Sequence, residues 1–145
     1  MAHVSTYLNF ERQTEQAFEY YRTVFGTAFT GDIVRFRDMP PAPGRPALAE
    51  ADGNLVLHME LPIVGGHVLM GTDAPRSMGF SLVQGNNVHI ALEIDTRAET
   101  ERLFAALSDG GKVAMPLQEM FWGAYFASFS DKFGTHWMVN CKAKQ

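Results

Sequence analysis

The sequence predicts an α+β protein built from two βαβββ modules. In each half of the chain a short extended stretch precedes an apolar stripe with helical spacing, and three strand-like segments follow. The halves overlay with a nearly constant offset, 83 residues from Thr6 to His89 and 84 from Gly26 to Gly110. This constancy indicates duplicated modules, about residues 1–73 and 86–145, joined by a linker over residues 74–85 within a single domain.

The first half shows one helix and four strands. The apolar residues of 17–25 recur at helical spacing, with Thr14 predicted as the N-cap and Gly26 as the residue that ends the helix. Gly65-Gly66 separates two apolar runs and predicts a hairpin. The proline-rich residues 39–46 are expected to form an exposed loop. Strands are expected over residues 4–10, 29–37, 55–64 and 67–70.

The second half repeats this order. Apolar and polar residues alternate over 88–94, as in a strand with one buried face. Thr96 and Glu99 have the spacing of a capping box, so a helix is expected to begin there and to end at Gly110-Gly111. Further strands are expected over residues 112–117, 124–130 and 136–141.

The composition excludes several classes of protein. The chain has 145 residues, a net charge of −4 and one cysteine. One cysteine cannot form an internal disulfide or an all-cysteine zinc site, and an acidic chain lacks the excess of Lys and Arg that nucleic-acid binding requires. No apolar run approaches the ~20 residues that span a bilayer, and no signal peptide is visible. We therefore expect a cytoplasmic protein without nucleic-acid or membrane partners.

Five groups of residues carry a family resemblance. They are Tyr7-Leu8-Asn9-Phe10, Ala17-Phe18-Glu19-Tyr20-Tyr21 with Val24-Phe25-Gly26, Leu69-Met70-Gly71-Thr72-Asp73-Ala74, Phe121-Trp122-Gly123, and Asp131-Lys132-Phe133-Gly134-Thr135-His136-Trp137. With these groups in this order and at this spacing, the chain resembles the vicinal oxygen chelate superfamily, which includes glyoxalase I, bleomycin-resistance proteins and extradiol dioxygenases. Within the superfamily it most resembles the PhnB-like branch. The resemblance implies a cup-shaped mixed sheet with helices packed on its outer face. It also implies a homodimer, and leaves open whether modules pair within one chain or across the dimer.

The resemblance further implies where a divalent metal would bind. The family's ligands come from the first, fourth, fifth and eighth strands, at positions that fall on Thr6, at or beside Met70, and on His89 and Met138. Only His89 is a usual ligand, because hydroxyl and thioether groups bind hard or borderline divalent ions poorly. A rearranged set of His89, Glu93 and His136 keeps a metal-dependent lyase, isomerase or dioxygenase open as an alternative.

The favoured interpretation is an apolar cup around His89 that binds a small organic molecule without a cofactor. The 11 Phe and 8 Met residues suit such a cup, and ligand sites are mostly apolar with a few placed polar groups. His58 and Glu60, two residues apart, share one face of their strand. The expected lining residues are Thr6, Leu8, Met70, His89, Glu93, Trp122, Phe126 and Met138.

Other chemistries find no support in the sequence, and no residue is singled out as catalytic. Cys141 lies on an apolar strand face and is expected to be a buried structural thiol. Ser128 and Ser130 lack the strand–turn–helix elbow of a serine nucleophile. No glycine-rich turn joins a strand to a helix, so a SAM-dependent methyltransferase is not expected. A chain that serves only as an interaction partner is a third alternative.

Overall fold

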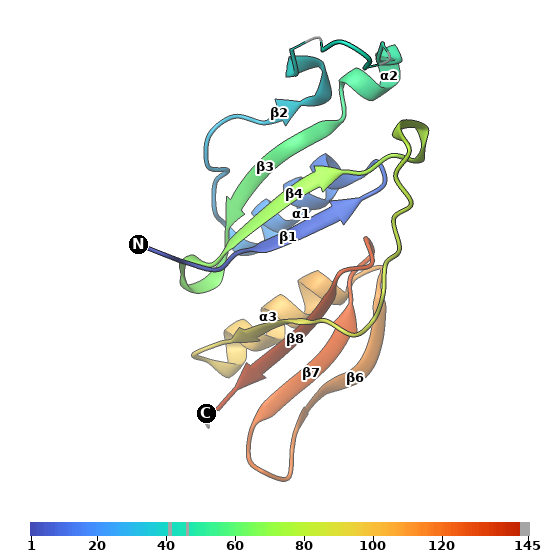
Figure 1. Ribbon diagram of the computed structural model, residues 1–145. Helices are drawn as coiled ribbons and strands as arrows, with labels where there is room; N and C mark the ends of the chain where they lie inside the picture. The colour runs from blue at the N-terminus through green and yellow to red at the C-terminus, as the bar shows by residue number, and fades with distance from the viewer. Residues whose placement is uncertain (41, 46, 143–145) are drawn as a thin grey trace. The chain divides into compact units, whose positions relative to one another are not determined.

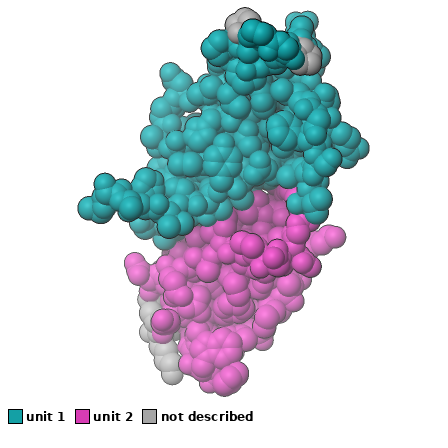
Figure 2. Space-filling view, in the orientation of Figure 1, with its two compact units in different colours: residues 1–83 teal, residues 84–145 magenta. Residues whose placement is uncertain are grey.

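The computed structural model describes residues 1–40, 42–45 and 47–142. The chain forms two compact units, residues 1–83 and 84–145 (Figure 2). Each unit holds one four-stranded mixed sheet with a twelve-residue helix packed on it (Figure 1). The predicted α+β class and two-module fold are confirmed.

Unit 1 forms a sheet with the strand order β1-β4-β3-β2. β1 runs parallel to β4, and the other neighbours are antiparallel. Its elements are β1 (Thr6–Phe10), α1 (Thr14–Phe25), β2 (Val34–Arg35), a 3-10 turn (Phe36–Asp38), α2 (Glu50–Gly53), β3 (Val56–Pro62), a 3-10 turn (Val64–Gly66), β4 (Val68–Asp73) and a 3-10 turn (Arg76–Met78).

Unit 2 repeats this topology with the strand order β5-β8-β7-β6. β5 runs parallel to β8, as β1 does to β4, and the remaining pairs are antiparallel. The equivalence of strand order and direction supports the duplication inferred from the sequence. Its elements are β5 (Ile90–Glu93), α3 (Arg97–Ser108), β6 (Lys112–Glu119), β7 (Tyr125–Ser130) and β8 (His136–Cys141).

α1 packs closely on its sheet because a glycine lies beneath it. Ala17, Phe18, Tyr21 and Val24 of the predicted stripe are buried, with Phe18 fully inaccessible to solvent, and Phe25 is half-buried. A Cβ atom added to Gly71 of β4 would lie only 2.7 Å from the Phe18 ring and from Cγ2 of Thr14. A side chain at position 71 would therefore push the helix away from the sheet.

Thr14 is not the N-cap that the sequence predicted. The cap position is Gln13, and Thr14 is the first helical residue. Its backbone N–H and its hydroxyl both donate to Oδ1 of the buried Asp73, at 3.0 and 2.8 Å, and the N–H of Val56 donates to Oδ2 at 2.8 Å. Asp73 thus supplies the acceptor expected from a cap and also ties α1, β3 and β4 together.

In unit 2 the helix begins as predicted. The Thr96 hydroxyl accepts a hydrogen bond from the backbone N–H of Glu99 at 3.2 Å, and α3 follows directly. Leu103 and Leu107 of α3 are buried in the core of this unit, whose sheet contributes the fully buried Trp137. α3 contacts β6, β7 and β8.

The strands expected over 29–37 and from Val88 are shorter in the structure than predicted. The strand expected over 29–37 is reduced to the two residues of β2, followed by a 3-10 turn. The strand expected from Val88 begins at Ile90, and Val88 is exposed. Within the expected loop 39–46, residues 41 and 46 lie outside the described residues, and the others form neither helix nor strand.

Candidate functional site

Each sheet has one face covered by its helix and one face that the helix leaves open. In unit 1, Gly71 faces α1, so its alternating neighbours Leu69 and Asp73 also face the helix. Met70 and Thr72 consequently point to the opposite side, which we call the open face of unit 1. Residues directly paired across strands lie on the same face of the sheet. The strand register therefore shows on which face each residue of the neighbouring strands lies.

The register divides the predicted lining residues of unit 1. Met70 lies on the open face, with Tyr7 level with it on β1 and Glu60 on β3. Thr6 and Leu8 are paired with Leu69 and Gly71, so both lie on the helix-facing side. The Thr6 hydroxyl is hydrogen-bonded there to Nε2 of His67, at 2.8 Å. The open face of β1 is therefore formed by Tyr7 and Asn9, one residue out of phase with the prediction.

A chain of three polar side chains occupies the open face of unit 1. The Tyr7 hydroxyl lies 3.2 Å from Nδ1 of His58, and Nε2 of His58 lies 2.8 Å from Oε2 of Glu60. The Tyr7 and His58 ring centroids are 5.8 Å apart. Because β4 lies between β1 and β3, the Tyr7–His58 contact crosses over β4. The sequence placed His58 and Glu60 on one face but missed Tyr7.

In unit 2 most of the predicted residues share one face. Ile90 and Leu92 are paired with the buried Trp137 and Val139, on the side covered by α3. The residues between them define the open face of unit 2. This face carries Glu93 from β5 and His89, the residue just before β5. It also carries Met138 and Asn140 from β8, and Phe126 and Ser128 from β7.

The polar groups on this face stand at its two ends. At one end the rings of His89 and His136 lie 5.2 Å apart at 57°, and Nε2 of His136 donates to the carbonyl oxygen of Gly85 at 3.1 Å. At the other end Nδ2 of Asn140 donates to Oε2 of Glu93 at 3.0 Å. His89 and Glu93 are four residues apart, which corresponds to about 13 Å along an extended chain.

Apolar and small side chains fill the middle of this face. Met138 is level with Ala91 on one neighbouring strand and with Ser128 on the other. Phe126 is level with Asn140 in the next row. The open face of unit 2 is thus a strip centred on the Met138 thioether, between an imidazole pair and an amide–carboxylate pair. Phe126 lies beside the amide–carboxylate pair, and β6 adds Met115 level with Ser128 and Gln118 level with Phe126.

Trp122 lies apart from this strip. It belongs to the turn between β6 and β7, where Gly123 N–H donates to the Met120 carbonyl at 2.9 Å. Phe121 and Trp122 are both exposed, and their rings meet edge-to-face at 4.8 Å. The tip of this hairpin is an exposed aromatic pair rather than part of the open face described above.

The rearranged metal set of His89, Glu93 and His136 does not converge. Glu93 stands at the opposite end of the face from the two histidines, with its carboxylate bonded to Asn140. Among residues 1–40, 42–45 and 47–142, no group of three His, Cys, Asp or Glu side chains is arranged to hold a metal ion. The donors at Met70 and Met138 are thioethers, so the residues present do not fit a hard or borderline divalent ion.

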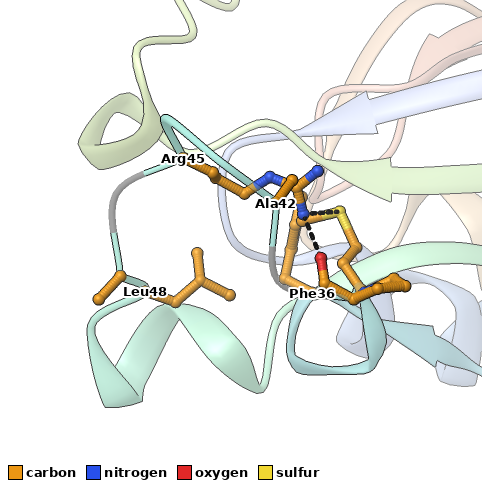
Figure 3. A pocket seen from close by; sticks show the side chains of 7 residues that line it. Phe36, Ala42, Arg45 and Leu48 are labelled. Atoms are coloured by element: carbon orange, nitrogen blue, oxygen red, sulfur yellow. Dashed lines mark hydrogen bonds between the residues drawn. The ribbon is translucent and has the colours of Figure 1, made fainter.

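Two hollows lie elsewhere in unit 1. One, of about 360 Å³, is formed within the proline-rich loop by Phe36, Met39, Pro40, Ala42, Arg45, Ala47 and Leu48 (Figure 3). Arg45 donates to the Pro40 carbonyl at 3.0 Å in its wall. The other, of about 310 Å³, is lined mainly by residues of the 74–83 segment. Neither contains a residue predicted to line the site.

Comparison with known proteins identifies the family. A sequence model of the Glyoxalase/Bleomycin resistance protein/Dioxygenase superfamily matches residues 3–139. The chain belongs to this superfamily. It is 29% identical to protein YjdN of Escherichia coli K12, over 98% of this chain and 97% of the relative. The resemblance predicted from the sequence motifs is confirmed.

Solved structures agree with this assignment. PA1353 of Pseudomonas aeruginosa is 33% identical and superposes with a TM-score of 0.84, covering 99% of this chain and 100% of that one. The PhnB protein of Bacillus cereus is 22% identical with a TM-score of 0.74, covering 97% and 99%, and shares the fold. In the described part of the chain, no helix has the length and apolar character needed to cross a membrane.

Proposed function

We propose that this superfamily member binds a small organic molecule on the open face of unit 2, with His89 as its main polar contact. The observation that carries the proposal is the arrangement of that face. Its strands place an imidazole pair and an amide–carboxylate pair at the two ends of an apolar strip. Small-molecule sites combine an apolar body with a few placed polar groups in this way.

Hydrogen-bond capacity distinguishes the two histidines. His136 already uses Nε2 in its bond to the Gly85 carbonyl. His89 contacts His136 through its ring, and within residues 84–142 its own ring nitrogens make no hydrogen bond. A neutral imidazole has one donor and one acceptor, so His89 can meet a ligand with either group. At the far end, Oε1 of Glu93 and the side-chain oxygen Oδ1 of Asn140 are available as acceptors.

The chemistry proposed is binding that does not depend on a metal or on a methyl donor. The thioethers of Met70 and Met138 replace the oxygen and nitrogen ligands that the superfamily's metals require. The Bacillus cereus neighbour bears the name "Putative 3-demethylubiquinone-9 3-methyltransferase". The connections from β1 to α1 and from β5 to α3, residues 11–13 and 94–96, contain no glycine with which to cradle such a cofactor.

Ligand binding can be tested by NMR with a library of small organic fragments. We expect some fragments to shift the backbone amide signals of residues 89–93, 126–128 and 136–140. His89→Ala should weaken binding of those fragments while the spectrum stays folded, and His3→Ala, which removes an exposed histidine, should leave it unchanged. Equal affinities in wild type and His89→Ala, or fragments that bind only in the loop hollow, would overturn the proposal.

We also propose that the chain acts as a cytoplasmic homodimer. The exposed aromatic pair Phe121 and Trp122 supports an interaction surface, since exposed Trp and Phe are enriched at interfaces. Light scattering should give twice the chain mass of 16.1 kDa. A mass of one chain at all protein concentrations would contradict the dimer.

A further inference from the structure

The open face of unit 1 carries a second cluster of titratable groups, apart from the site proposed above. Tyr7, His58 and Glu60 form a continuous chain of contacts of 3.2 and 2.8 Å on this face. They come from β1 and β3, which flank β4. β4 presents Val68, Met70 and Thr72 here, and β2 presents Val34 level with His58. The facing positions on β2 and β4 thus add no charge to the cluster.

The direction of each hydrogen bond follows from the groups involved. An ionised carboxylate only accepts, so Nε2 of His58 carries a hydrogen and donates a hydrogen bond to Oε2 of Glu60. In a neutral imidazole Nδ1 is then an acceptor, and the Tyr7 hydroxyl must donate to it. The lone pairs of the Tyr7 oxygen remain available to accept a hydrogen bond from a bound molecule.

A proton gained by His58 reverses the role of Tyr7. Nδ1 of the imidazolium would donate to the Tyr7 oxygen, and the Tyr7 hydroxyl hydrogen would turn toward a bound molecule. The positive charge would lie against the Glu60 carboxylate, with which His58 already forms a 2.8 Å contact. Protonation of His58 would thus turn its contact with Glu60 into an ion pair.

We propose that Tyr7, His58 and Glu60 form a proton-accepting site for a small, weakly acidic hydroxyl compound that binds as its anion. The O–H bond of the ligand breaks and its proton joins the Tyr7 oxygen, while the Tyr7 O–H bond breaks and its proton joins Nδ1 of His58. The ligand gains one negative charge and His58 one positive charge, so no oxidant or reductant is required. Glu60 balances the imidazolium.

The surroundings of the cluster indicate the body of the ligand. Tyr7 is about half exposed, at 48%, so its oxygen can be reached. Met70 lies between Tyr7 and Glu60 in the same row of the sheet. Two tilted rings and a thioether offer contacts to a flat apolar body, since sulfur and aromatic groups associate favourably. An aromatic or enolic hydroxyl compound therefore fits the site.

The test uses p-nitrophenol, because its ionised form absorbs visible light and its neutral form does not. In buffer at about pH 7, adding wild-type protein should produce a saturable rise in phenolate absorbance above that of the free probe. Tyr7→Phe and His58→Gln should abolish this signal. Tyr125→Phe, which removes a tyrosine hydroxyl in unit 2, and His3→Gln should retain it, as should His89→Ala.

The outcomes separate this proposal from the one before it. Binding without phenolate absorbance, no saturable binding, or a full signal in Tyr7→Phe would each overturn the proton-accepting site. Loss of the signal in His89→Ala would place the probe on unit 2 and would also overturn it. Folding of each variant is checked by circular dichroism, and Tyr7→Phe keeps the ring and its packing, so a lost signal reports the hydroxyl.

Discussion

Replacing Asp131 with asparagine should destabilise the part of unit 2 that positions His136 and Met138. Asp131 is buried after the end of β7. Its Oδ1 accepts the backbone N–H groups of Phe133 and Thr135 at 2.8 and 3.1 Å, and its Oδ2 accepts Nε1–H of Trp137 at 2.8 Å. One carboxylate thus shapes the turn and anchors the indole at the start of β8.

An asparagine has only one oxygen, so it cannot accept from both sides. If that oxygen stays with the backbone N–H groups, the NH₂ group of the asparagine faces the indole N–H of Trp137. Both groups are donors, so no hydrogen bond forms between them. Leaving a buried donor unsatisfied costs about 1–3 kcal/mol, and a hydrogen bond to a charged group contributes about 1.5–3 kcal/mol. We expect Asp131→Asn to lower the free energy of unfolding by about 2–4 kcal/mol.

Urea denaturation followed by tryptophan fluorescence measures this loss. At a typical slope, the unfolding midpoint should fall by about 1–2 M. Asp109→Asn is the matched control, because Asp109 is exposed beyond the end of α3 and should change stability by less than about 0.5 kcal/mol. If Asp131→Asn were as stable as this control, the carboxylate would not hold the turn as described.

Two further predictions concern unit 1. Gly71→Ala should cost about 1–3 kcal/mol in urea denaturation because its Cβ meets Phe18, whereas Gly53→Ala, whose nearest contact is at 3.4 Å, should be tolerated. The paired hydrogen bonds from Arg35 lower the pKa of Glu15, so this pair stabilises the fold above the unfolded-state pKa and loses that effect as the pH falls through the folded-state value. Glu15→Gln should therefore be less stable than wild type at neutral pH, and the gap, at most about 1 kcal/mol for a partly exposed pair, should close below about pH 4. A gap independent of pH would contradict it.

The elements could be predicted because their patterns are local. The apolar stripe of α1 and the capping of α3 by Thr96 depend on residues within a few positions of one another. The role of Thr14 could not be read in this way, because its partner Asp73 lies 59 residues away. A cap position thus depends on tertiary contacts that no local pattern contains.

The faces on which strand residues lie were predicted better in unit 2 than in unit 1. Around His89 and Glu93, the alternation of Ile90 and Leu92 marks the buried side of the strand, and the face prediction agrees with the register. In β1, alternation and the family match both placed Leu8 in the cup, whereas its pairing with Gly71 puts it on the helix-facing side. A shift of one residue moves every side chain of a strand to the other face, which is why Tyr7 was missed.

The most direct test of the proposed binding site is a crystal structure of the wild-type protein soaked with a fragment selected in the NMR screen. The account predicts a ligand on the open face of unit 2, within hydrogen-bond distance of His89 and in contact with Met138 and Phe126. A ligand ordered elsewhere on the chain, with this face bearing only solvent, would contradict it.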